Sequence, residues 1–247
     1  MRDLRVLCLH GYRRSAASMR LQMAPLAATL PTSVELVYMD APSLADSGFR
    51  WWDEGFSGWE HTRDWAIELI NASSPIHGLF GFSQGAALAG LLAGIRDSPA
   101  APIAFDFAIM VSGFTSYEPQ HADLFLSKLT VPSAHIIGHA DTNVWPRDSL
   151  LLADRFADPL IIDHAGGHVI PADASVTAQV ASFGVALFAY LRMRSGADAI
   201  KLDLRVRRSL ARMGFSIPPG ENALLLLAEG GAEELGVARL ALDQVLW

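Results

Sequence analysis

One short stretch constrains the fold of this chain more than any other. Residues 76–86 read Ile-His-Gly-Leu-Phe-Gly-Phe-Ser-Gln-Gly-Ala, a pattern typical of an apolar strand, a tight turn around Ser83 and the start of an alanine-rich helix. The centre of the stretch fits G-x-S-x-G, which requires a strand before the serine and a helix after it. The sequence supplies both, so it predicts a nucleophile elbow in an α/β fold.

The elbow explains why glycines flank the serine. The serine of such a turn has a strained backbone, and only small neighbours let the strand and the helix pack closely behind it. The turn lifts Ser83 Oγ above the edge of the sheet and leaves the Gln84 N–H at the start of the helix. There the N–H can face the negative charge that develops on a carbonyl oxygen under attack. We expect Ser83 to be the nucleophile and the Gln84 N–H to be an oxyanion-hole donor.

Apolar runs elsewhere extend the α/β pattern along the chain. Helical segments separate these runs, as in βαβ units, and predict a mostly parallel sheet with helices on both faces. The first of these helices begins after Ser15 or Ser18 and continues to about Leu30. The further predicted strands are residues 4–9, 34–39, 105–111, 133–137 and 159–163, and the further predicted helices are residues 61–71, 86–95, 146–156 and 173–191.

Composition restricts the class of protein. The 247 residues are 51% hydrophobic and carry a net charge of −7, which predicts a soluble globular chain and argues against nucleic acid as a partner. No apolar run is long enough to span a membrane and the N-terminus shows no signal peptide, so we expect a cytoplasmic protein. The single cysteine, Cys8, is expected to be a small buried apolar residue.

A second site follows the first strand, where the chain reads His10-Gly11-Tyr12. In folds with a nucleophile elbow, one oxyanion donor comes from a loop after an early strand. A glycine lets that backbone approach the substrate, so we expect the Tyr12 N–H to be the second donor and His10 to order the loop. The alternative interpretation is an ordinary turn between a strand and a helix.

The remaining members of a catalytic triad follow two later strands. Asp141 comes after the strand at 133–137, and His168 comes after the strand at 159–163. The order Ser83, Asp141, His168 is the order of this fold. We expect His168 to take the serine proton and Asp141 to hold the imidazole. The competing candidates are His164 for the base and Asp163 or Asp148 for the acid. The histidines show no metal-site spacing, so we expect neither metal nor cofactor.

Residues 43–65 break the alternation and hold most of the tryptophan of the chain. A long loop this aromatic is unusual for a solvated linker. It is expected to form a flap that lines the substrate pocket; the alternative is that its aromatic side chains pack on the scaffold. We expect four side chains to contact the substrate, namely Trp51, Trp52, Phe114 and Val144.

These motifs resemble those of the FSH-type serine hydrolases, small α/β-hydrolases related to yeast enzymes and to a human hydrolase linked to ovarian tumours. The resemblance covers residues 3–192, and Arg14 stands where that family usually has glutamine. The resemblance implies a compact sheet without the first antiparallel strands of larger hydrolases. The matching segments are residues 9–13, 51–52, 81–86, 111–114, 138–141 and 166–171.

The same resemblance implies catalytic roles and an activity. It makes Ser83 the nucleophile, Asp141 the acid and His168 the base. It also implies carboxylesterase activity on acyl esters, while some fungal members of the family are thioesterases that release polyketides from a synthase. We therefore expect a serine carboxylesterase. The alternatives are a thioesterase for carrier-bound or CoA-bound acyl chains and a non-catalytic binding protein with the same fold, and the triad alone does not separate the two enzyme readings.

The chain is expected to divide into a hydrolase domain at 1–195 and a mainly helical extension at 196–247. In the extension, one helical face carries basic residues. Either the extension packs on the domain or on another subunit, or it docks an acidic partner such as an acyl carrier protein or an anionic lipid surface. The basic residues are Lys201, Arg205, Arg208 and Arg212.

Overall fold

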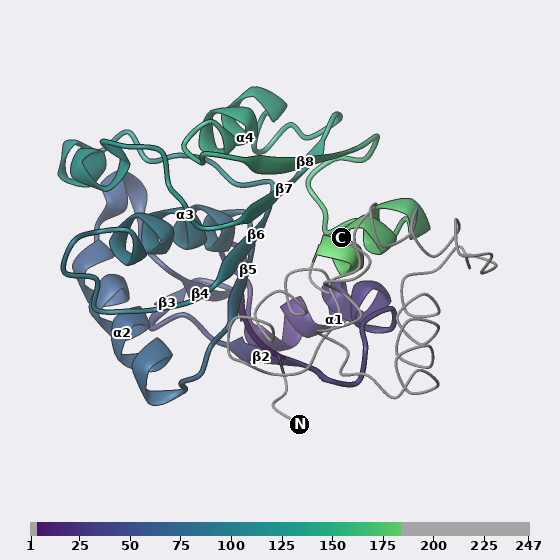
Figure 1. Ribbon diagram of the computed structural model, residues 1–247, viewed down its shortest axis with the longest axis horizontal. Helices are drawn as coiled ribbons and strands as arrows, with labels where there is room; N and C mark the ends of the chain where they lie inside the picture. Colours follow the sequence, from purple (N-terminus) through teal and green to yellow (C-terminus); the bar gives the residue numbers. More distant parts are fainter. Residues whose placement is uncertain (1–3, 184–247) are drawn as a thin grey trace, which may run out of the picture. The chain divides into compact units, whose positions relative to one another are not determined.

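A parallel six-stranded sheet runs through the computed structural model, which describes residues 4–183 (Figure 1). The strand order is β2-β1-β5-β6-β7-β8, and every neighbouring pair is parallel. The sheet confirms the predicted α/β-hydrolase fold. The strands are β1 (Leu4–Leu9), β2 (Val34–Met39), β5 (Gly78–Phe82), β6 (Phe107–Val111), β7 (Ser133–Gly138) and β8 (Pro159–His164).

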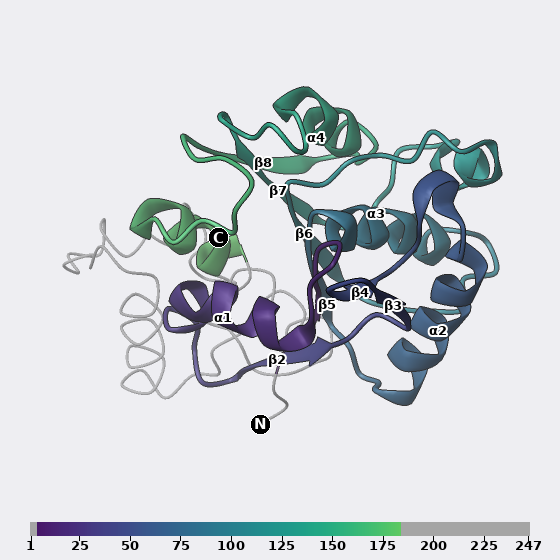
Figure 2. The same cartoon turned by 180° about the vertical axis from the view of Figure 1, so that it is seen from behind.

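Helices cover both faces of the sheet. Helices α2 and α3 lie on one side and α1 on the other, as the two opposite views show (Figures 1 and 2). Residues 174–183 are also helical. Through Gln179 the described residues form one compact unit. The helices with printed bounds are α1 (Ala16–Ala27), α2 (Trp59–Ala72), α3 (Gln84–Arg96) and α4 (Pro146–Ala153).

Local hydrogen bonds set where α1 begins and ends. Ser15 is the N-cap, because its hydroxyl accepts from the Ser18 N–H while the Ser18 hydroxyl accepts from the Ser15 N–H, at 3.2 and 2.9 Å. The helix ends at Ala27 rather than at Leu30, because the Leu30 N–H bonds the Ala27 carbonyl in a tighter turn. Helix α4 likewise ends at Ala153, before the expected Phe156.

Helix α3 is the central helix of the core. It packs against β5 and β6, and its residues from Gln84 to Ile95 are all buried. Alanine, glycine and leucine fill most of these positions, and the small side chains let the helix lie close to the sheet. The first turn of α3 is therefore held rigidly at the carboxyl ends of the strands.

The aromatic stretch at 43–65 is not the long loop that was expected. Strands β3 (Ser43–Ala45) and β4 (Gly48–Arg50) form an antiparallel hairpin, the 3₁₀ helix η1 (Glu54–Phe56) follows, and α2 begins before His61, at Trp59. The indoles of this stretch belong to the hydrophobic core, since Trp51, Trp52 and Trp59 are at most 5% exposed. Burial of these large side chains orders the segment against the scaffold.

Two sequence expectations concern membranes and the C-terminal extension. Among the helices of residues 4–183, none is long and apolar enough to cross a membrane. The boundary expected at residue 195 and the extension at 196–247, with its basic helical face, lie outside the described residues.

Candidate active site

Ser83 lies in the sharp turn between the end of β5 and the start of α3. Its backbone has φ 56° and ψ −118°, a conformation that non-glycine residues rarely adopt. The turn is held from both sides: the Ser83 N–H donates to the Val111 carbonyl at 2.9 Å, and the Ser83 carbonyl accepts the Ala87 N–H at 3.0 Å. The strained serine is thus fixed by the neighbouring strand β6 and by the helix that follows it.

Gly81 and Gly85 make this turn sterically feasible. A Cβ atom at Gly81 would lie 2.3 Å from the Gly85 carbonyl oxygen, and one at Gly85 would lie 2.1 Å from the Leu9 carbonyl oxygen. Backbone atoms occupy both spaces, so no side chain can be accommodated by a rotamer change. The G-x-S-x-G pattern therefore reflects close packing of strand, helix and β1.

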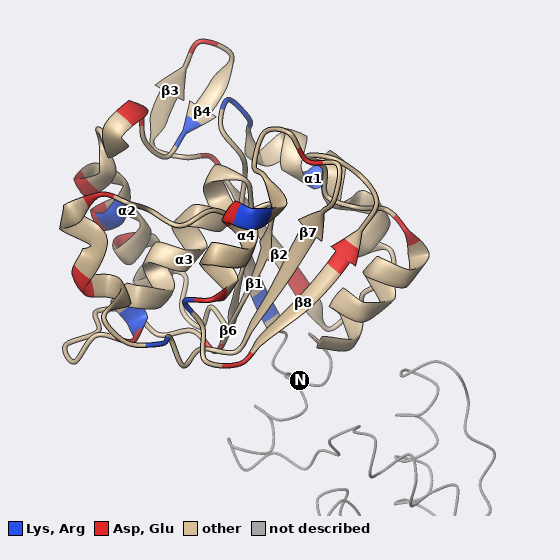
Figure 3. Cartoon of the chain, turned by 90° about the horizontal axis from the view of Figure 1, so that it is seen from above, with Lys and Arg blue, Asp and Glu red and all other residues tan. Residues whose placement is uncertain are grey.

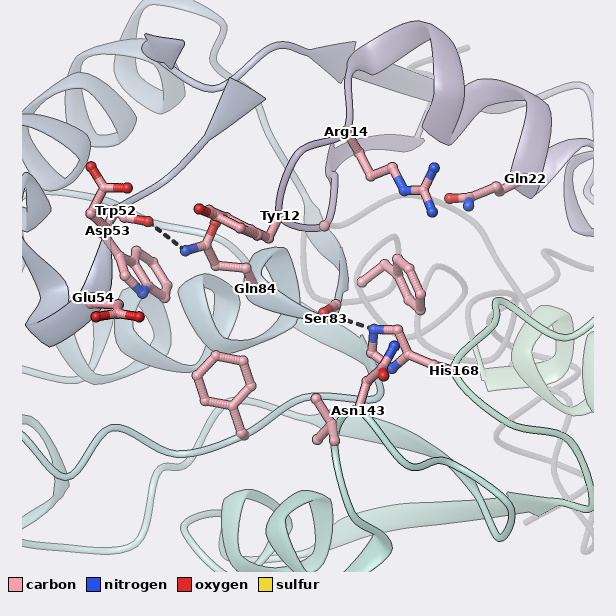
Figure 4. A pocket seen from close by; sticks show the side chains of 14 residues that line it. Tyr12, Arg14, Gln22, Trp52, Asp53, Glu54, Ser83, Gln84, Asn143 and His168 are labelled. Carbon is pink, nitrogen blue, oxygen red and sulfur yellow. Dashed lines mark hydrogen bonds between the residues drawn. The ribbon is translucent and has the colours of Figure 1, made fainter. Parts of the chain in front are cut away.

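The structure brings Ser83, His168 and Asp141 into one hydrogen-bonded chain. His168 Nε2 lies 2.9 Å from Ser83 Oγ (Figure 4), and His168 Nδ1 lies 2.8 Å from Asp141 Oδ2. An ionised carboxylate can only accept, so Nδ1 carries the proton. Nε2 then presents its lone pair to the Ser83 hydroxyl. This arrangement can move a proton from the serine to the imidazole.

Asp141 is held in its ionised form by its surroundings. Burial raises the pKa of this carboxyl, but hydrogen bonds from His168, Val144 and Asn143 outweigh burial and leave the pKa below its ordinary value. The N–H groups of Asn143 and Val144 donate to Oδ1 at 2.9 and 3.0 Å. Oδ2 is thereby left for His168, and the carboxylate has a single orientation.

The competing candidates for the acid and the base take no part in these hydrogen bonds. His164 accepts the Gly166 N–H at Nδ1, at 3.1 Å, and so supports the loop that carries His168. Asp163 is exposed on β8, with Oδ1 3.7 Å from His139 Nε2. Asp148 lies in the first turn of α4 beside Arg147.

His10 ties the loop after β1 into place. Its Nε2 accepts the Ala41 N–H at 3.0 Å, so the proton sits on Nδ1, which donates to the Gly11 carbonyl at 2.8 Å. Burial lowers the pKa of His10, which keeps the ring neutral. Within the described part of the chain, the N–H groups of Tyr12 and Gln84 donate to no other acceptor. Both residues line the pocket beside Ser83, so both N–H groups are available to an oxyanion.

The Gln84 side chain ties α3 to the segment after β4, a contact that the sequence did not predict. Its Oε1 accepts the Trp51 N–H at 3.1 Å, and its Nε2 donates to the Trp52 carbonyl at 2.8 Å. The Trp51 indole N–H donates in turn to the His10 carbonyl at 2.7 Å. A lone carboxamide at the start of an otherwise apolar helix was the available signal, because a buried amide must find partners.

A cavity of about 580 Å³ opens over Ser83 and His168 (Figure 4). Of the expected substrate contacts, Trp52, Phe114 and Val144 line it. Trp51 does not, and this expectation is corrected: its indole is fully buried, where it holds the His10 carbonyl. Among residues 4–183, no group of histidine, cysteine and carboxylate side chains could hold a metal ion. The other lining residues are Gly11, Tyr12, Arg14, Gln22, Asp53, Glu54, Phe82, Gln84 and Asn143.

The chain matches a family of serine hydrolases and is similar to proteins named esterases. The model of a family described as serine hydrolase (FSH1) matches residues 1–180. Esterase OVCA2 of Xenopus tropicalis is 32% identical over 203 residues, which cover 70% of this chain and 88% of that protein. Esterase AGAP003155 of Anopheles gambiae is 34% identical over 196 residues, which cover 70% of this chain and 74% of that protein.

Solved structures share the fold. The chain is similar to acyl-protein thioesterase 2 of Zea mays, with a TM-score of 0.57 and 20% identity over 76% of this chain and 94% of that one. It is also similar to a carboxylesterase of Mesorhizobium loti, with a TM-score of 0.53 and 18% identity over 75% of this chain and 89% of that one. At these identities the likeness shows a common fold.

Proposed function

The chain belongs to the FSH1 serine hydrolase family, and from this premise we propose that it hydrolyses acyl esters with Ser83 as the nucleophile. The observation that carries the proposal is the chain of two hydrogen bonds, 2.9 and 2.8 Å long, from Ser83 through His168 to Asp141. The relatives named esterases support the ester as substrate. Asp141 is the carboxylate member of the triad, which stays ionised, and His168 is the base.

Acylation follows from the protonation states of the site. Ser83 Oγ attacks the carbonyl carbon of the ester while its proton passes to His168 Nε2. The carboxylate of Asp141 stabilises the imidazolium that forms and keeps Nδ1 protonated. The negative charge on the former carbonyl oxygen is stabilised by the N–H groups of Tyr12 and Gln84. When the tetrahedral intermediate collapses, His168 gives its proton to the departing oxygen.

Deacylation reverses these roles. Water enters where the alcohol left, and His168 removes its proton as the water oxygen attacks the acyl carbon. The same two N–H groups stabilise the second oxyanion. Collapse returns the proton to Ser83 Oγ and releases the carboxylic acid. During both steps the acyl group contacts the wall of the pocket formed by Trp52, Phe114 and Val144.

The proposal is tested with a series of acyl groups, short to long, offered as oxygen esters and as coenzyme A thioesters. Ser83→Ala should lower kcat on the order of 10⁶-fold, because no other group replaces the nucleophile. The matched control is Ser47→Ala, which removes an exposed hydroxyl from the β3–β4 turn. Equal turnover by the Ser83→Ala variant and the unaltered protein would refute the assignment. Turnover of thioesters alone would replace the ester proposal with a thioesterase.

A further inference from the structure

Arg14 differs from the other arginines that the structure describes. Each of the others has a partner: an acidic side chain within 4 Å or an aromatic ring beneath its guanidinium. In residues 4–183, Arg14 has neither, although it lines the pocket. A guanidinium left without a partner beside a catalytic serine has its charge and its five N–H donors free for a ligand.

The backbone of Arg14 is held in place by its neighbours. Its N–H donates to the Gly11 carbonyl at 3.2 Å, and its carbonyl accepts the Phe49 N–H of the β3–β4 hairpin at 2.8 Å. The loop that presents the Tyr12 N–H therefore also presents Arg14. In Figure 4 the Arg14 guanidinium points toward the carboxamide of Gln22, which comes from α1.

The opposite end of the pocket carries negative charge. Asp53 and Glu54 line it there, beside Trp52. Asp53 is paired with Arg50 at 2.8 Å, whereas no ion pair of the described residues involves Glu54. An anionic substrate group at this end would meet like charge, while at the other end it would meet Arg14. The pocket is therefore polarised.

The mechanism decides which half of the substrate lies at each end. His168 must pass its proton to the departing atom, so the leaving group lies on the His168 side of Ser83. Figure 4 shows Arg14 and Gln22 on that side of Ser83 and Trp52 on the other. The acyl half accordingly meets the aromatic wall, and the leaving group meets the guanidinium.

We propose that the preferred substrates carry an anionic group, either a carboxylate or a phosphate, on the alcohol or thiol half. Arg14 binds this anion, with Gln22 beside it. The acyl half is uncharged. A guanidinium donates two parallel N–H bonds to either kind of anion, and such charge-assisted bonds are about twice as strong as neutral ones. This inference rests on the proposed function, because it assigns the leaving group by way of His168.

The test uses three aryl butyrates that differ only in one ring substituent: a carboxylate, a phosphate monoester or a neutral carboxamide. We expect kcat/KM for the two anionic esters to exceed that for the carboxamide by about tenfold, the lower end for a charged hydrogen bond because Arg14 is exposed. Arg14→Gln should remove this preference, and Arg14→Lys should restore part of it. The carboxylate and phosphate arms identify which anion the site favours.

Two controls separate local recognition from net charge. Arg63→Gln makes the same change in net charge at a partly exposed position of α2 that does not line the pocket, and should keep the preference for the anionic esters. A phenyl ester of succinate puts the carboxylate on the acyl half and should be a poorer substrate than phenyl butyrate. Salt at about 0.5 M should reduce the Arg14-dependent preference, because it screens the attraction between the guanidinium and the anion.

Failure of anion binding by Arg14 and failure of the proposed hydrolase function give different results in these assays. If Ser83-dependent turnover is present but the ratio of anionic to neutral esters is the same in the unaltered protein and in Arg14→Gln, the inference is wrong and the proposed function stands. A preference for the succinate ester would also overturn it. Absence of Ser83-dependent turnover for every ester would overturn the proposed function, and the inference with it.

Discussion

Asp141 uses its two carboxylate oxygens for different tasks. Oδ1 accepts the N–H groups of Asn143 and Val144, which shapes the loop after β7, while Oδ2 holds His168 Nδ1. The same loop brings Val144 to the pocket. One side chain thus orients both His168 and part of the pocket wall. An amide at this position keeps the shape of the side chain, so it tests the effect of the negative charge and of the imidazole tautomer alone.

Asp141→Asn should lower kcat by about 10⁴ at neutral pH. The amide keeps its size, but its NH₂ group favours the wrong imidazole tautomer, and no negative charge stabilises the imidazolium. The measurement is kcat for one ester across pH, with thermal unfolding as a check on the fold. Asp163→Asn is the matched control, because Asp163 is exposed and lies on β8 beside His139. A larger loss in Asp163→Asn than in Asp141→Asn would reassign the acid.

At the scale of elements, Gln84 links α3 to the segment after the β3–β4 hairpin and, through the Trp51 indole, to the loop after β1. All three bonds are buried. The turn at Ser83, the pocket lining at Trp52 and the loop after β1 at His10 are therefore parts of one rigid network rather than three independent loops. Removal of the Gln84 carboxamide should therefore change both the stability of the protein and its preference among substrates.

Gln84→Met should lower the free energy of unfolding by about 2–3 kcal/mol, because it leaves the buried Trp51 N–H and Trp52 carbonyl without partners. The main-chain N–H at position 84 is retained, so we expect Ser83-dependent turnover to persist with a changed preference for acyl length. Urea unfolding and kcat/KM for the acyl series check both effects.

The comparison for this variant is Gln120→Met, which removes an exposed carboxamide and should change the free energy of unfolding by less than about 0.5 kcal/mol. Equal stability of the Gln84→Met and Gln120→Met proteins would show that the buried network contributes little.

At the scale of the whole molecule, charge lies on helices, loops and strand ends around the sheet (Figure 3), but several histidines are buried. Burial lowers the pKa of His10 and His121, and it lowers the pKa of His135 to about 3. His135 lies on β7, with Nε2 3.1 Å from Ser133 Oγ, and packs on Phe156. These rings are neutral in the folded state and gain protons more readily when the chain unfolds.

Stability should therefore fall as the pH falls below the ordinary histidine value of 6.5. The unfolded chain binds protons there that the folded chain excludes, so the neutral ring of His135 removes about 1.4 kcal/mol of unfolding free energy for each pH unit below 6.5, and the lowered pKa values of His10 and His121 act in the same direction. Above about pH 7.5 histidines are neutral in the unfolded chain as well, so the dependence of stability on pH from these residues should vanish. Urea unfolding between pH 7.5 and 5.0 measures the slope.

His135→Gln should flatten this dependence while keeping a polar atom near Ser133. His61→Gln, at an exposed position of α2, should leave the slope as it is. If the slope were the same in the His135→Gln protein and in the unaltered one, burial of His135 would not be the source of the acid sensitivity.

The sequence by itself determined the fold class, the elbow and the order of the candidate triad. These features are local: the strained turn at Ser83 demands glycine within two residues on each side, and the alternation of apolar strands with helices predicts a parallel sheet. The ends of parallel strands then carry Asp141 and His168 to one edge. The roles of the three residues stay a prediction, which the Ser83→Ala and Asp141→Asn variants test.

Only the tertiary structure decided which aromatic side chains face the pocket and how its charge is distributed. Trp51 and Trp52 are adjacent in the sequence, yet one is fully buried against His10 and the other lines the cavity, because their partners lie 41 and 32 positions away in the sequence. The polarity between Arg14 and Glu54 likewise arises where separate loops converge. No local periodicity carries such information, since it depends on contacts that exist only after the sheet has formed.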